Sequence, residues 1–165
     1  MQPKWIVLSQ CLRGAGGYYN ARLTPRFLSS RYYARRAVIR ETTEIKGDRI
    51  IEAYTALWPT YRKEWYELGT VWVTDTLRGN GVRARIMDEA TNLAPEGARL
   101  FLITAVGSIT RSAQDLGFFP VTIRTHPSLL LWASEIGMGE RLPSSARSVD
   151  EPAFVEGVRT LFIRP

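Results

Sequence analysis

The segment of residues 67–87 constrains the fold of this chain more than any other part of the sequence. Val71 and Val73, with aromatic neighbours, are typical of a buried or half-buried strand. From Val82 onward, apolar residues recur at helical spacing. A short turn with two glycines separates the two patterns, so the sequence predicts a strand, a tight turn and a helix in direct succession.

The turn at residues 78–81 has the chemistry of an anion-binding site. Gly79 and Gly81 have no side chains to block an approaching ligand, and Arg78 beside them carries a positive charge. The first amides of the following helix have no acceptor within the helix and lie at the positive end of its dipole. The sequence therefore indicates a phosphate-binding turn, although short arginine and glycine strings also occur in purely structural loops.

Arg78-Gly79-Asn80-Gly81 resembles the pyrophosphate-binding turn of the GNAT superfamily of acyl-CoA-dependent N-acetyltransferases, whose pattern is Gln/Arg-x-x-Gly-x-Gly/Ala. Arg78 and Gly81 match that pattern. Arg83 replaces the final Gly/Ala, and its side chain either crowds the turn or adds charge for the 3'-phosphate of coenzyme A. The resemblance implies acetyl-CoA as cofactor, with these binding residues: Trp72, Val73, Thr74, Arg78, Gly79, Asn80, Gly81, Val82 and Arg83.

A second local match covers residues 112–119, S-A-Q-D-L-G-F-F, which resemble the family's Tyr-x-x-x-Gly-Phe at the end of its fourth helix. Gly117 and Phe118 match. Ala113 stands at the position of the family tyrosine, which in many members is thought to protonate the departing thiolate. The resemblance therefore implies the cofactor site more directly than it implies the usual acid catalysis.

Transfer of an acyl group from a thioester to an amine needs a neutral nitrogen and a polarised carbonyl. Glu67 lies on the strand before the turn, where acidic residues resembling the family's general base often occur, and we predict that it is catalytic. The alternative is an exposed glutamate at a strand end. Ser112 and Tyr66 are candidate donors to the thiolate, and Ser112 is the second predicted catalytic residue. With one histidine and one cysteine, the chain is not expected to hold a catalytic metal.

Strand and helix patterns alternate along the rest of the chain. The patterns predict strands at 5–8, 37–44, 49–58, 65–74, 99–104, 118–123 and 159–163, helices at 24–35, 82–92, 108–116 and 127–136, and a polar loop at 141–152. This order predicts an α/β fold with a mixed sheet, similar to the GNAT arrangement of a central, mostly antiparallel sheet flanked by helices. A chain of 165 residues is expected to form one domain, residues 1–165.

The net charge of +6 is concentrated at one end of the sequence. Residues 1–40 contain eight basic and no acidic side chains, which leaves 14 basic and 16 acidic residues in the remainder. Tyrosines are interleaved with these arginines, a composition suited to RNA, including tRNA, or to an acidic substrate. The alternative, which we favour, is a solvated helix face beside the cofactor entrance.

The single cysteine, Cys11, excludes an internal disulfide, so we expect a reducing, cytoplasmic location. No apolar run approaches the length of a membrane span, and we expect a soluble protein. Two functions remain. The first is an acyl-CoA-dependent N-acyltransferase acting directly on an amine of a small molecule or protein. The second is a non-catalytic GNAT-fold module that binds coenzyme A, RNA or a protein.

Overall fold

The computed structural model describes residues 2–14, 23–43, 47–60, 62–121 and 160–165. The chain divides into two compact units. The first unit consists of Met1–Trp58 and Thr70–Ala94, and the second of Pro59–Gly69 and Pro95–Pro165. One strand, β3 (Trp65–Val73), contributes its first half to the second unit and its second half to the first.

The first unit contains three α-helices, the strand β1 and all of β2 except its last residue among its described residues. They are α1 (Pro3–Gly14), α2 (Pro25–Tyr33), β1 (Ala37–Thr43), β2 (Arg49–Pro59) and α3 (Val82–Thr91), with a short 3-10 helix at Asp75–Leu77. β1 and β2 are antiparallel, and their register places Ala37 opposite Ala56. A bulge interrupts the pairing between Arg40 and Glu41.

Helix α2 forms where the sequence predicts it, because its first residues satisfy the helix N-terminus. The backbone amide of Phe27 donates to the Thr24 hydroxyl at 3.4 Å. Pro25 occupies the first turn, where its missing N–H costs nothing.

The predicted strand at residues 5–8 is wrong, because these residues belong to α1. Trp5, Leu8 and Leu12 recur at helical spacing and are buried, whereas Ile6 is 43% and Val7 39% exposed. A short apolar run fits a strand as well as a helix. The burial of Leu12, further along the chain, is what distinguishes the helix from the strand.

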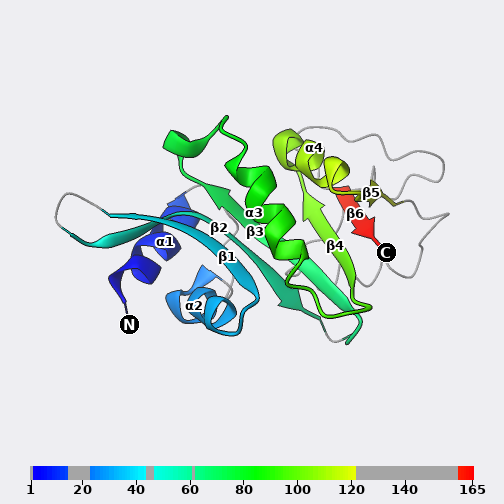
Figure 1. Cartoon of the computed structure of the whole chain (residues 1–165), viewed down its shortest axis with the longest axis horizontal. Helices are drawn as coiled ribbons and strands as arrows, with labels where there is room; N and C mark the ends of the chain where they lie inside the picture. Colours follow the sequence, from blue (N-terminus) through cyan, green and yellow to red (C-terminus); the bar gives the residue numbers. More distant parts are fainter. Residues whose placement is uncertain (1, 15–22, 44–46, 61, 122–159) are drawn as a thin grey trace. The chain divides into compact units, whose positions relative to one another are not determined.

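Both faces of β2 are buried. On one face it joins the core formed with α1 and α2, whose members are Trp5, Leu8, Leu12, Leu23, Leu28, Ala37, Ile51, Tyr54, Ala56 and Trp58. The alternate residues Ala53, Thr55 and Leu57 are also buried. Helix α3 contacts β1 and buries Ile86 and Met87, and Figure 1 shows it lying across this part of the sheet.

In the second unit, β3 pairs in parallel with β4 (Arg99–Thr104) from Trp65 to Glu67. Strand β6 (Thr160–Arg164) is antiparallel to β4 and also pairs with β5 (Phe119–Pro120). Helix α4 (Gly107–Asp115) contacts β4. Gly117 lies just beyond its end at a φ of +82°, a left-handed conformation that suits glycine at a helix C-terminus.

The strand order β1-β2-β3-β4-β6-β5 gives a mixed, six-stranded sheet, and the predicted α/β fold is confirmed (Figure 1). The predicted strand at 118–123 corresponds to β5, and the one at 159–163 to β6. The predicted helix at 127–136 and loop at 141–152 lie outside the described residues. The single-domain organisation stays a prediction.

Candidate functional site

The turn between β3 and α3 owes its shape to two glycines. Gly79 has a φ of +83° and Gly81 a φ of +69°, both in the left-handed region that other residues rarely adopt. A Cβ placed at either position would meet nothing within 4 Å. Backbone conformation, rather than crowding by the protein, therefore requires glycine at both positions, and the space beside them is open to a ligand.

The N-terminus of α3 is suited to an anion. Gly81 is its N-cap residue, and no side chain of the described part of the chain caps the helix. Arg83 and Arg85 occupy the first turn, although positive charges there are repelled by the helix dipole. An anion on the first amides would satisfy these donors and offset both charges.

Arg78 precedes this helix with its side chain in solvent. Its Nη2 lies 2.9 Å from Oδ1 of Asp75, and the two side chains are 60% and 84% exposed. Such an exposed ion pair contributes about 0–1 kcal/mol, so the guanidinium can exchange Asp75 for a phosphate at little cost. Arg83 is half-buried, and Arg85 donates from Nη2 to the Asn80 carbonyl oxygen at 3.3 Å.

At the end of β3, the backbone amides of Val73 and Thr74 point in opposite directions. The Thr74 amide donates to the Glu52 carbonyl oxygen of β2 at 2.8 Å. Because successive amides of an extended chain alternate in direction, the Val73 amide points away from β2. The Trp72 side chain packs against the α1 and α2 core, and Val73 is buried.

Thr70, two residues earlier on β3, is a feature that sequence reasoning missed. Its φ of +56° is a rare conformation for a β-branched residue. The indole Nε1 of Trp58 donates to its hydroxyl at 3.2 Å. No local pattern signals this conformation, apart from the neighbouring Gly69. Such backbone outliers concentrate at functional sites, so Thr70 is a candidate for a functional-site residue on β3.

In the second unit, Glu67 lies on β3 opposite Phe101 of β4 and is only 7% exposed. The alternative of an exposed strand-end glutamate is therefore wrong. A carboxylate is rarely buried without a structural or chemical role. Glu67 remains a candidate general base on these grounds.

Helix α4 carries the remaining candidates. Ser112 is half-buried, and its hydroxyl donates to the Ser108 carbonyl oxygen at 3.2 Å. Ala113, at the position of the family tyrosine, is fully buried. Thr110, three residues earlier on the same face, is also buried, and its hydroxyl has no hydrogen-bond partner among the described residues. Sequence reasoning missed Thr110, because helical threonines commonly bond back to their own helix.

The basic N-terminal region is partly neutralised within the first unit. Lys4 forms an ion pair with Glu41, and Arg40 forms one with Glu89. Arg36 donates from Nη1 to the Leu93 carbonyl oxygen at 2.8 Å. These contacts engage three basic side chains of residues 1–40 within the first unit, so part of the charge excess is already used in internal contacts.

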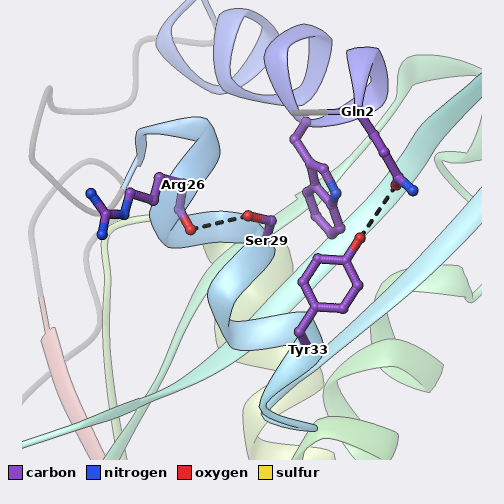
Figure 2. A pocket seen from close by; sticks show the side chains of 5 residues that line it. Gln2, Arg26, Ser29 and Tyr33 are labelled. Atoms are coloured by element: carbon purple, nitrogen blue, oxygen red, sulfur yellow. Dashed lines mark hydrogen bonds between the residues drawn. The ribbon is translucent and has the colours of Figure 1, made fainter.

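A cavity of about 700 Å³ lies between α1 and α2 (Figure 2). It is lined by Gln2, Trp5, Arg26, Ser29 and Tyr33. The Tyr33 hydroxyl donates to Oε1 of Gln2 at 3.4 Å, and the Ser29 hydroxyl donates to the Arg26 carbonyl oxygen at 3.1 Å. Arg26 is its one charged lining side chain among the described residues, and this face of α2 carries no predicted site residue.

The described residues contain no group of three or more His, Cys, Asp or Glu side chains placed to hold a metal ion. In the same residues, no helix has the length and apolar character needed to cross a membrane.

No protein-family model matches the sequence, and no curated protein matches it. Solved structures do match. The NatC complex bound to Gag peptide and CoA contains a chain that aligns with a TM-score of 0.65 and 13% identity, covering 100% of this chain and 92% of that one. A GNAT-family acetyltransferase from Staphylococcus aureus aligns with a TM-score of 0.54 and 12% identity, covering 98% and 90%.

N-acetylglutamate synthase from Neisseria gonorrhoeae, in complex with coenzyme A and N-acetyl-glutamate, aligns with a TM-score of 0.57 and 14% identity. The match covers 98% of this chain and 32% of the synthase, so this chain spans about a third of that enzyme's length. The chain thus has the fold of the GNAT acetyltransferases, at identities that show the fold alone.

Proposed function

We propose that this chain is a divergent GNAT acyltransferase that transfers an acyl group, with acetyl as the proposed acyl group, from acyl-CoA directly to an amine. The turn that opens α3 carries this proposal, with its two left-handed glycines, its helix N-terminus without a side-chain cap and its arginines. The matched structures of the NatC complex and of N-acetylglutamate synthase, which have the same fold, contain coenzyme A. One domain spanning residues 1–165 and a cytoplasmic location are part of the same proposal.

In this proposal the pyrophosphate binds at the N-terminus of α3. The amides of Gly81 and Val82, at the helix N-terminus, are its proposed donors, and Arg78 and Arg83 are the proposed source of positive charge. The Val73 amide, directed away from β2, is available to the pantetheine or the acyl carbonyl. Trp72, Thr74, Gly79 and Asn80 complete the predicted binding segment.

The chemistry assigned to the second unit is proton transfer. As the amine nitrogen bonds to the acyl carbon and the carbon–sulfur bond breaks, the nitrogen loses a proton and the thiolate gains one. Glu67, a buried carboxylate, is the proposed acceptor of the first proton, directly or through water. Ser112 is the proposed donor of the second: its hydroxyl passes a proton to the thiolate as it takes one from water, and Glu67 returns the first proton to solvent.

Release of free thiol from acetyl-CoA, measured with a panel of amines, tests this proposal. Glu67→Gln is expected to lower kcat by about 100-fold or more, because a positioned general base contributes at least that factor. Glu64→Gln is the control, since Glu64 is an exposed glutamate three residues away in the same unit. An unchanged rate in Glu67→Gln would remove Glu67 from the mechanism.

The second candidate is a non-catalytic module with the same fold, which binds coenzyme A, RNA or a protein. The burial of Ala113 at the tyrosine position favours it, because no phenol is present there to protonate a thiolate. A module of this kind binds coenzyme A but releases no thiol with any amine. An RNA-binding module would in addition lose affinity steeply with salt.

A further inference from the structure

Arg31 is a half-buried residue of α2. Its Nε is buried and has no hydrogen-bond partner among the described residues, and none of the ion pairs of those residues includes its guanidinium. Buried donors are normally satisfied, and an unpaired one is costly. Residues 1–40 contain no acidic side chain that could compensate the charge locally. Among the described residues of the first unit, the charge of Arg31 thus has no carboxylate partner.

The surroundings of Arg31 fix its orientation without neutralising it. Its Cζ lies 5.9 Å from the ring centroid of Trp58, in a cation–π contact. Burial raises the pKa of Tyr54 well above its usual range, and the charge of Arg31 opposes that shift. Tyr54 is therefore a neutral phenol, whose hydroxyl donates to the Leu28 carbonyl oxygen at 3.1 Å. The positive charge of Arg31 therefore acts on a buried group of the core, Tyr54, as well as on solvent.

Within the first unit, a chain of contacts links Arg31 to the segment of β3 that is proposed to bind the acyl group. Trp58, under the guanidinium, donates to the hydroxyl of Thr70, the residue in the left-handed conformation. Trp72 follows two residues later, about 7 Å along the strand. Arg31 is thus connected through one side chain to the stretch where the proposed acyl group binds.

We propose that Arg31 binds a carboxylate of the acceptor, so that the acceptor is a small amine that also carries a carboxylate, such as an amino acid. This inference rests on the proposed function. The N–H groups of a guanidinium form a planar fork that matches the two oxygens of a carboxylate. A carboxylate bound to the guanidinium would neutralise its charge.

Matched acceptors and matched variants test the inference. Thiol release is measured for amino acids and for the corresponding carboxamides, with Arg31→Gln and Arg26→Gln. Arg26 lies on the same helix and loses the same charge, but it lines the cavity between α1 and α2 (Figure 2). We expect Arg31→Gln to lower kcat/KM for the acids by about 10- to 100-fold, through KM, and to leave the carboxamides unchanged. Arg26→Gln is expected to change neither.

Equal use of acids and carboxamides by the unmodified chain would overturn the inference, as would an equal loss for both in Arg31→Gln. The cofactor is monitored separately by the rise in melting temperature with coenzyme A, which Arg31→Gln should retain. If coenzyme A produces no rise, the proposed function fails. If it does and the acids show no preference, the carboxylate site alone fails. Arg31→Lys, which keeps the charge without the fork, should recover only part of the preference for acids.

Discussion

The N-terminus of α3 and the end of α4 depend on different parts of the chain for their proposed roles. The first depends on backbone: two left-handed glycines and a helix terminus without a cap. The second depends, in the family that it resembles, on one tyrosine side chain, and here a buried Ala113 takes its place. A cofactor site built from amides survives divergence of its neighbours, whereas acid catalysis is lost with a single residue.

The start of α3 and the end of α4 also differ in their charges. Arg78, Arg83 and Arg85 surround the start of α3, where they oppose the dipole unless an anion is bound. The buried face of α4 carries no charge, and its polar group is the hydroxyl of Thr110, which has no hydrogen-bond partner among the described residues. The first region therefore has the chemistry of an anion site, whereas in the proposed enzyme the second would need a proton donor other than tyrosine.

The largest effect is expected from Gly81→Glu, which should abolish the rise in melting temperature with coenzyme A. The substitution places a side chain at a φ of +69° and a negative charge beside the helix N-terminus. Gly97→Glu is the matched control, because Gly97 has a φ of +73° and equally open surroundings. Both variants should lower the melting temperature of the free chain, but only Gly81→Glu should lose the response. A response retained in Gly81→Glu would move the cofactor to another site.

A smaller effect is expected on α4. Ser112→Ala should lower kcat by about tenfold, less than the hundredfold typical of a dedicated general acid, because a serine hydroxyl is a weak acid. Thr110→Val, a change of similar shape on the buried face, should alter kcat less than twofold. It should also leave the melting temperature equal or higher, since it removes a buried hydroxyl without a partner. The reverse result, a large loss in Thr110→Val alone, would assign the proton donor to Thr110.

Sequence patterns predicted most elements whose signals are local. Strand β4 has the predicted bounds of residues 99–104, and α2, Pro25–Tyr33, lies within the predicted helix of residues 24–35. Helix α1 was missed because an apolar run of four residues fits a strand as well as a helix. The conformation of Thr70 and the unsatisfied Nε of Arg31 could not be predicted, because both arise from contacts between distant segments.

The most direct test of the central claim is the binding of coenzyme A to the unmodified chain, compared with pantetheine, which lacks the phosphates. At a concentration of about 100 times its Kd, a ligand stabilises the folded state by about 2.7 kcal/mol, which a melting curve detects readily. The account predicts a clear rise in melting temperature with millimolar coenzyme A and a much smaller rise with pantetheine. No rise with coenzyme A, or equal rises with both, would contradict a phosphate-binding turn at the start of α3.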